Sequence, residues 1–567
     1  MLKNINSTFF LFFVVIINFS CKKNYLSYTT TEGSYYSRQV WYSDRNTRSF
    51  LNDIYNGLST PTSSASATTL ASRYNIDGNG AMLSEGSDEA ISSNPSSIMY
   101  NFSNGGWGAT NLIDDNYTVT YNYIRRTNMF LTNVGTSAVY PATDTVELKS
   151  EAYFLRAYFY FELLKRYGGV AIITKVLAPT DNLNLPRNTY NEVVKQIIND
   201  CDSALVGLPL WNGVLGNTYD SFTWDDGARG RATQTATLAL KCRTLLYAAS
   251  PLNNPSNDLS KWQAAADVAN QIIQYNVHGL LNSADYSTFW DYDVSSVTYN
   301  KEVIFATSAL QTNAIDQHNA PVGYNTASGL CNPTQDLVDA FETNKGYPIN
   351  DFKSGYNQQN PYFRRDPRLG YFILYNGASY KGRAVQTYQG GADNLPTNIN
   401  STKTGYYMRK FLSESATWNS VPNVTRRRPW IIFRYAEILL NYAEALNEAR
   451  GPVQGVYDAI NTLRARVQLP ALPTGVSQDS IRTRIHNERR VELCFEDHRF
   501  YDIRRWKQGN VYLNGNIMGM NVVKNGSVLT YTPVSVGTRV WNEKNYLYPF
   551  DQSEIYKNPN LIQNDGY

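Results

Sequence analysis

The stretch RYAEILLNYAEALNEARGPVQGVYDAINTLRARVQLP, residues 434–470, decides the fold class. In its first half, apolar residues recur every three or four positions, which predicts an amphipathic helix. Gly451 and Pro452 end that helix, because proline cannot continue the hydrogen-bond ladder, and a second helix then runs to Pro470. The two segments therefore predict a helical hairpin.

The spacing inside this hairpin is typical of a repeat unit. Leu446, Ala459 and Leu463 stand at the relative spacings of the Leu, Ala and Phe positions of a tetratricopeptide hairpin. We therefore expect an all-α superhelix of tetratricopeptide-like hairpins with long irregular loop insertions and minor β-structure, in one unit spanning residues 21–567. Two further pairs of helices are expected at residues 111–134 with 146–169 and at residues 188–205 with 231–250.

Two segments lack helical periodicity. Residues 60–110 and 278–332 are rich in polar residues, Gly and Asn, and we expect both to be loop insertions. Residues 22–39 are expected to form an extended tether ahead of the first helix, and residues 364–428 are expected to contain minor strands at most.

Residues 481–506 predict one helix that is dense in charges of both signs. Glu488 and Glu496 are compatible with acid–base catalysis, but Arg and Glu that alternate on packed helices more often form ion pairs. We therefore expect the face with Glu488, Arg490, Glu496 and Arg499 to be structural.

The N-terminus indicates export. Lys3 precedes the apolar run FFLFFVVII, which is too short to span a membrane, so residues 1–20 are expected to be a signal peptide. Cys21 directly follows the small residue Ser20, as in lipoproteins, and is expected to carry the lipid anchor. Cys201 and Cys242 continue apolar helical stripes and are expected to be buried core thiols.

Composition and motifs exclude several classes of function. A net charge of +3 with 17% charged residues does not indicate a nucleic-acid-binding surface. The four histidines have no metal-ligand spacing, and no phosphate-binding or dinucleotide-binding motif is present, so we expect no metal and no cofactor. The acid pairs Asp88-Glu89 and Asp225-Asp226 are nominal catalytic candidates, but we expect adjacent acids in loops to be solvated.

Three sequence blocks stand out, RYAEILLNYAEALNEA at 434–449, NERRVELCFEDHRFYDIRRWK at 487–507 and YLYPFDQSEIYKNPNLIQNDGY at 546–567. These blocks resemble the SusD/RagB family, the nutrient-binding outer-membrane lipoproteins of Bacteroidetes. The resemblance spans nearly the whole mature chain and is weakest over residues 60–107 and 278–329.

This resemblance implies a cell-surface protein, lipid-anchored in the outer membrane through Cys21 and facing the exterior. It implies that the chain is not an enzyme and that it captures an oligosaccharide and delivers it to a SusC-like TonB-dependent transporter. A peptide-binding member of the same family and an all-α glycoside hydrolase stay open as alternatives, and so does a scaffold for protein partners.

The ligand site is expected among the aromatic residues of the two insertions. Sugars present C–H faces that stack on aromatic rings and hydroxyls that need carboxylate or amide partners. The alternative for each ring is that it fixes its loop to the helices. The expected site residues are Trp107, Trp290, Tyr292 and Tyr324, with Tyr74 and Asp77 as polar support.

Overall fold

The structure is a computed structural model that describes residues 40–59, 73–136, 142–210, 230–291, 300–307 and 310–567. Within these ranges the helices from α2 to α12 pack in a row in which each long helix contacts the next, α13 and α14 both pack on α12, and the periodicity of the sequence predicted most of them. The expected all-α superhelix of hairpins is confirmed. The row consists of α2 (Asp44–Tyr55), α3 (Tyr117–Asn133), α4 (Ala142–Tyr167), α5 (Tyr190–Leu205), α6 (Gln234–Ala249), α7 (Leu259–Tyr275), α12 (Tyr435–Arg450), α13 (Gln454–Arg466) and α14 (Gln478–Glu492).

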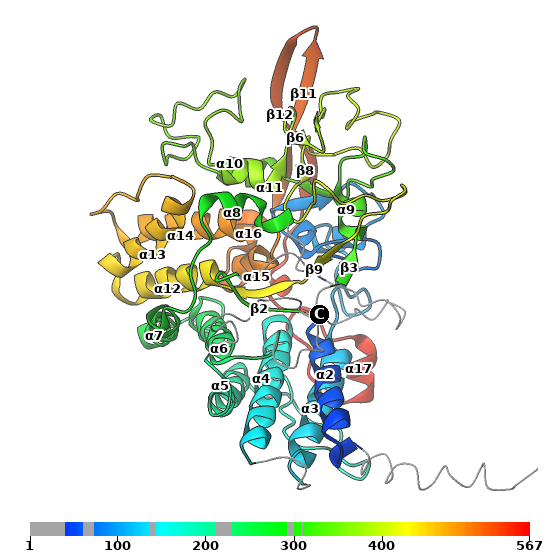
Figure 1. The fold of residues 1–567 in the computed structure, drawn as a ribbon, viewed down its shortest axis with the longest axis vertical. Coiled ribbons are helices and arrows are strands. Elements are labelled where there is room, and N and C mark those ends of the chain that lie inside the picture. Colours follow the sequence, from blue (N-terminus) through cyan, green and yellow to red (C-terminus); the bar gives the residue numbers. More distant parts are fainter. Residues whose placement is uncertain (1–39, 60–72, 137–141, 211–229, 292–299, 308–309) are drawn as a thin grey trace, which may run out of the picture.

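The row continues directly from α7 to α12, although residues 276–434 separate these helices in the sequence. Figure 1 shows α2 to α7 in the lower half of the molecule and the short helices α8 to α11 of the intervening segment in the upper half. None of the helices that the structure describes is long and apolar enough to cross a membrane. The short helices are α8 (Ser283–Thr288), α9 (Ala314–Asn319), α10 (Gln335–Ala340), α11 (Arg368–Phe372), α15 (His498–Arg505), α16 (Gly509–Tyr512) and α17 (Gln552–Lys557).

Two-stranded antiparallel sheets join segments that lie far apart in the sequence. β1 pairs with β4, so the described parts of the two insertions are linked by backbone hydrogen bonds. Many side chains of residues 73–110 are buried, including Met82 and Leu83, so this insertion belongs to the core. The paired strands are β1 (Ala90–Ser92) with β4 (Cys331–Pro333), β2 (Val303–Ala306) with β10 (Ile431–Arg434), β3 (Leu310–Thr312) with β9 (Arg426–Arg428), β5 (Ile373–Leu374) with β8 (Tyr407–Met408) and β6 (Ser379–Tyr380) with β7 (Arg383–Ala384).

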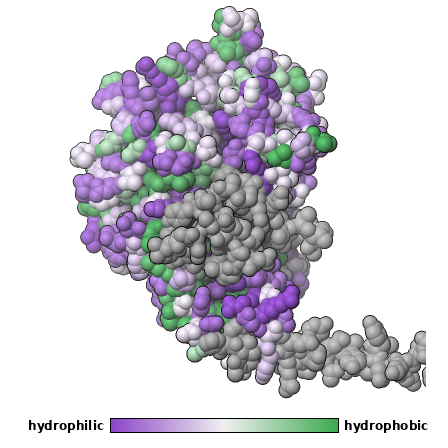
Figure 2. Space-filling view, viewed as in Figure 1, coloured by the Kyte–Doolittle hydropathy of each residue, from purple (hydrophilic) through white to green (hydrophobic). Residues whose placement is uncertain are grey.

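A long β-hairpin near the C-terminus was not expected. It consists of β11 (Gly515–Asn525) and β12 (Val528–Arg539), and it forms the top of the molecule in Figure 1. Gly526 has a φ of 62°, which suits the first position of a two-residue hairpin loop. Figure 2 shows hydrophobic residues near this tip, where Val528 is 64% exposed.

The charged segment at 481–506 is two helices, not the single helix that we expected. α14 ends at Glu492 and α15 begins at His498, because Phe495 and Asp497 adopt left-handed φ values of 64° and 65°. Residues from elsewhere in the chain hold this break. A carboxyl oxygen of Glu89 accepts the Phe495 N–H at 3.2 Å, and Lys410 Nζ donates to Cys494 O at 2.9 Å.

The charged side chains of this segment form buried ion pairs that link the helical row to the upper half. Glu496 accepts two hydrogen bonds of 2.7 Å from Arg434 and one of 2.7 Å from Lys410. Glu488 lies 2.6 Å from Arg368 and 3.3 Å from Arg464. These contacts give Glu488 and Glu496 structural partners.

The acid pair Asp88-Glu89 is buried, which contradicts the expectation of solvated loop acids; Asp225-Asp226 lies outside the described residues. The Arg490 and Arg499 guanidinium groups lie 2.9 Å and 2.8 Å from the Asp88 carboxylate, and their charges lower its pKa despite its burial. Burial raises the pKa of Glu89 to about 8, and the Asp88 charge adds to this. Cys201 and Cys242 are buried free thiols, as predicted.

A second buried acid, Glu85, has its pKa raised to about 8 by burial, and the Asp77 charge contributes. For a carboxyl group whose pKa is higher in the folded than in the unfolded chain, stability is present below about pH 4.3 and is lost as the pH rises through the folded pKa. The double variant Glu85→Gln, Glu89→Gln should therefore gain about 1–3 kcal/mol relative to the unmodified chain as the pH rises from 5 to 8. Chemical denaturation at several pH values measures this gain.

The control for this experiment is Glu543→Gln, because Glu543 is an exposed acid. Its free energy of unfolding is measured over the same pH range. Parallel pH curves for the double variant and the unmodified chain would contradict a raised pKa of these two carboxyl groups.

Candidate ligand-binding surface

Trp107, one of the expected site residues, is a core residue. Its side chain is 1% exposed, and its ring lies edge-on to those of Phe102 and Tyr548, with both centroids 4.8 Å away. A ring that is enclosed in this way has no free face for a sugar. The structure therefore corrects the expectation that Trp107 presents a stacking surface.

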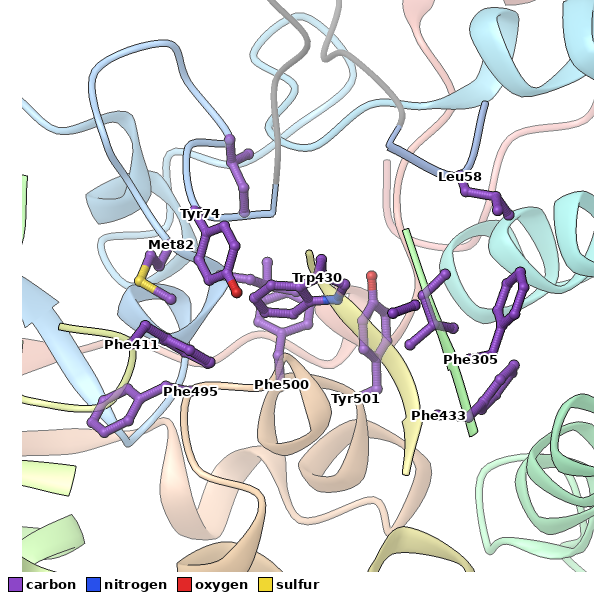
Figure 3. Packing of buried hydrophobic residues seen from close by; sticks show 14 of the residues in the cluster. Leu58, Tyr74, Met82, Phe305, Phe411, Trp430, Phe433, Phe495, Phe500 and Tyr501 are labelled. Atoms are coloured by element: carbon purple, nitrogen blue, oxygen red, sulfur yellow. The ribbon is translucent and has the colours of Figure 1, made fainter. Parts of the chain in front are cut away.

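Tyr74 and Trp290 are buried as well, each 6% exposed, and both contact Phe411. Their ring centroids lie 5.1 Å and 5.3 Å from the Phe411 ring, and the Tyr74 hydroxyl donates to Pro429 O at 3.0 Å. Figure 3 shows Tyr74 close to Phe411 and Trp430. These two rings hold the insertions together, which is the alternative that the sequence left open.

The other three expected residues do not form one site either. Asp77 is half-buried, and its carboxylate accepts the N–H groups of Asn79 and Ala81 at 2.8 Å and 3.1 Å, so it stabilises a local turn. Tyr292 lies outside the described residues. Tyr324 is half-buried at the surface.

The ring of Tyr324 is covered by the guanidinium group of Arg383, which lies 3.7 Å from the ring centroid. Arg383 donates two hydrogen bonds of 2.7 Å to Asp393, and the Tyr324 hydroxyl donates to Tyr380 O at 2.8 Å. Burial raises the pKa of Tyr324 to about 12, although Arg383 lowers it, so the phenol is neutral at physiological pH. Asp393 thus fixes the position of Arg383, and the Tyr380 carbonyl fixes the position of Tyr324.

Two loops meet beside this pair and present amide groups to solvent. Trp418 Nε1 donates to Asn325 O at 2.7 Å, and Asn325 Nδ2 donates to Trp418 O at 2.8 Å. Asn419 Nδ2 donates to Thr326 Oγ1 at 2.6 Å. Asn325, Thr326 and Asn419 are nevertheless exposed residues.

The backbone adopts left-handed conformations at this surface, and the β-branched residue Thr326 is strained there. Asn325, Thr326 and Asn419 have φ values of 28°, 62° and 50°, and Lys381 in the turn between β6 and β7 has a φ of 46°. A positive φ is rare for residues other than glycine, especially for a β-branched residue such as Thr326. Such strain concentrates at ligand sites and switch regions, where the surrounding structure maintains it. We call the six residues Tyr324, Asn325, Thr326, Lys381, Arg383 and Asn419 the Tyr324 surface.

The chemistry of the Tyr324 surface suits a neutral polar ligand. The stacked ring and guanidinium form a flat area, and Asn amides and Thr hydroxyl groups donate and accept hydrogen bonds. Among the described residues, no group of three or more His, Cys, Asp or Glu side chains is arranged to hold a metal ion.

Sequence reasoning identified only Tyr324 of this surface. Arg383 and Asn419 lie in the segment 364–428, for which we expected only turns and minor strands. The turns themselves were the available signal, because Asn and Gly in short loops tolerate the left-handed backbone found here.

Comparison with known proteins gives two matches to family models. Residues 301–567 match the SusD family model. Residues 32–213 match a model described as starch-binding, associating with outer membrane. Together the two matches include most of the helical row and the Tyr324 surface.

Individual relatives agree with these matches. SusD-like protein P2 of Formosa agariphila is 26% identical over 435 residues, which are 74% of each chain. A SusD-like protein from Bacteroides fragilis has a crystal structure with a TM-score of 0.76 and 28% identity, covering 93% of this chain and 98% of its own. A SusD-like carbohydrate binding protein from the same species gives a TM-score of 0.73 and 26% identity, covering 92% of this chain and 100% of its own.

Proposed function

Because the chain belongs to the SusD family, we propose that it is a carbohydrate-binding protein of the outer membrane. In this proposal it captures an oligosaccharide at the Tyr324 surface and delivers it to a SusC-like TonB-dependent transporter. A matching family model described as starch-binding and a structural relative described as a carbohydrate binding protein support carbohydrate as the ligand class.

One observation carries the placement of the site: Arg383, which Asp393 fixes, is stacked on Tyr324 beside exposed loops with left-handed backbone. A preformed flat surface costs little conformational entropy when a ligand binds, since its side chains are already immobilised. The neighbouring amide groups are suited to the hydroxyls of a sugar.

The proposed lipid anchor, Cys21, and the tether at 22–39 lie outside the described residues. We keep both in the proposal, because acyl chains on Cys21 would hold the chain at the membrane of its transporter. Each buried CH₂ of an acyl chain contributes roughly 0.8 kcal/mol, so several chains suffice for stable anchoring.

An all-α glycoside hydrolase has less support. Such an enzyme needs two carboxyl groups that flank the scissile bond. Asp393, next to the Tyr324 surface, is fully buried and engaged by Arg383. Incubating the purified protein with glycans and analysing the products for shortened chains tests the hydrolase.

A peptide-binding role uses the same kind of surface and is the second candidate.

The proposal is tested by screening glycan and peptide arrays and then measuring the best ligand by calorimetry. Tyr324→Ala should weaken binding by about ten- to a hundredfold, because removal of an aromatic contact costs roughly 1–3 kcal/mol in base-stacking proteins. Tyr42→Ala is the matched control, since Tyr42 is 60% exposed and lies near the N-terminus. Normal binding by a folded Tyr324→Ala variant would place the site elsewhere, and binding of peptides alone would favour the second candidate.

A further inference from the structure

The segment between α10 and α11 exposes two phenylalanine rings to solvent. Phe352 is 89% exposed and Phe363 is 61% exposed. We call residues 344–364 the Phe352 loop. Figure 1 shows this loop at the upper left, whereas α9, which precedes Tyr324 in the sequence, lies at the right. The two rings are therefore not part of the Tyr324 surface.

Contacts within the Phe352 loop join the two rings into one surface. The Asn344 N–H donates to Arg364 O at 2.8 Å, so the start of the loop lies beside its end. Lys345 Nζ lies 3.5 Å from Lys353 O, next to Phe352. Basic side chains thus connect the end of the loop that carries Phe363 with the turn that carries Phe352.

The Phe352 loop is held in place by hydrogen bonds. The Asp351 carboxylate accepts the Lys353 N–H at 2.8 Å. The Gln359 amide pairs with both backbone groups of Tyr531 at 3.1 Å and 3.0 Å, which ties the loop to β12. Arg364 keeps a left-handed φ of 54°. A surface that is already ordered loses little conformational entropy when a ligand binds.

The charges of the loop favour an acidic ligand. Arg364 Cζ lies 5.0 Å from the centroid of the Phe363 ring, and Lys353 Nζ lies 5.4 Å from that of Phe352. In the part of the chain that the structure describes, neither cation forms an ion pair, nor does Lys345. The single acid of the loop is Asp351, so positive charge predominates beside both rings.

The other exposed side chains of the loop distinguish between classes of acidic ligand. Amides suit the hydroxyls of a sugar, whereas their insertion into lipid is costly. The described loop exposes no aliphatic side chain, and its two phenylalanine rings do not contact each other, so it lacks the apolar centre of a typical protein interface. The exposed amides are Asn344, Asn350, Asn357, Gln358, Gln359 and Asn360.

We propose that the Phe352 loop is a second carbohydrate-binding surface, which binds an acidic polysaccharide. Phe352 and Phe363 stack on the C–H faces of sugar rings. Lys345, Lys353 and Arg364 bind the carboxylate or sulfate groups of the polymer through charge-assisted hydrogen bonds. The inference rests on the proposed function for its ligand class, carbohydrate, and a polymer bound here leaves the Tyr324 surface free.

The test is biolayer interferometry of the full chain on immobilised polygalacturonate, dextran sulfate and neutral dextran. The chain should bind at least one of the two acidic polymers and not dextran. The double variant Phe352→Ala, Phe363→Ala should weaken this binding by at least about tenfold, on the scale of aromatic contacts in base-stacking proteins. The double variant Lys353→Gln, Arg364→Gln should weaken it similarly and make it less dependent on salt.

Matched controls separate this surface from general charge attraction. Lys175→Gln removes a cation that is 73% exposed, and Tyr42→Ala removes a ring that is 60% exposed, both outside the loop. Both controls should bind the acidic polymers normally, and so should Tyr324→Ala. An equal loss with Lys175→Gln would overturn the inference. Thermal unfolding of each variant should match that of the unmodified chain, because the substituted loop residues are exposed.

The remaining outcomes separate this inference from the proposed function. If the chain binds its ligand from the glycan array but neither acidic polymer, the second surface is overturned and the proposed function stands. If it binds no glycan at all, the proposed function is wrong as well. Binding of polyglutamate or of phosphatidylglycerol vesicles that depends on the two phenylalanines, without binding of the polymers, would overturn carbohydrate as the ligand of the loop.

Discussion

Glu492→Gln is expected to lower the free energy of unfolding by about 3–5 kcal/mol. Glu492 is fully buried and accepts hydrogen bonds from Arg434 at 2.7 Å, from Arg466 at 2.6 Å and from Arg368 at 3.0 Å. A neutral glutamine leaves these cations without part of their compensating charge in an environment that water does not reach. The loss should be the same with and without ligand, because the cluster is structural.

The charge of Glu492 also predicts how this effect depends on pH. Arg466 and the other two arginines hold its pKa well below the ordinary value, despite its burial. A carboxyl group with a lowered folded pKa stabilises the chain above its unfolded pKa, and this stabilisation is lost as the pH falls through the folded value. The difference between Glu492→Gln and the unmodified chain should therefore be largest at neutral pH and shrink in acid.

Denaturant unfolding at pH 7 measures this difference. Glu414→Gln is a suitable control, because Glu414 forms a comparable pair with Arg409 at 3.0 Å but has a side chain that is 44% exposed. Surface pairs contribute little, so we expect a change below about 1 kcal/mol. If Glu492→Gln were as mild as this control, the buried cluster would not stabilise the fold.

The helical row was predictable from the sequence because amphipathic periodicity is a local property. α12 and α13 follow from residues 434–470 alone, whatever they pack against. The break between α14 and α15 was not predictable in this way, because Phe495 and Cys494 are held by Glu89 and Lys410, which are distant in the sequence. Helical periodicity continues across the break, so only the tertiary partners reveal it.

The β11–β12 hairpin was not predicted from the sequence, for a different reason. A register shift between Ile517 and Met518 interrupts the alternation of buried and exposed residues, and most of β12 faces solvent on both sides. Period two is the main sequence signal of a strand, and it is weak when a bulge shifts it or when neither face is buried.

The candidate site was predictable only as a region. Aromatic residues in polar loops mark both loop anchors and ligand contacts, and the sequence does not distinguish them. Trp290 and Tyr74 are anchors because both pack against Phe411, whereas Tyr324 is half-buried, with the Arg383 guanidinium 3.7 Å from its ring centroid. Both partners belong to a segment for which local patterns predicted little regular structure.

Trp107→Ala separates the anchors from the ligand contacts. The Trp107 ring fills a space between Phe102, Tyr548 and the Arg504 guanidinium, whose Cζ lies 5.9 Å from its centroid. Truncation of a buried tryptophan leaves a cavity that its neighbours cannot close, so the free energy of unfolding should fall by about 3–5 kcal/mol. Calorimetric binding by the folded fraction should be unchanged, which is the reverse of the result expected for Tyr324→Ala. If Trp107→Ala unfolded like the unmodified chain and lost its ligand, Trp107 would be a ligand contact and the Tyr324 surface would lose its main support.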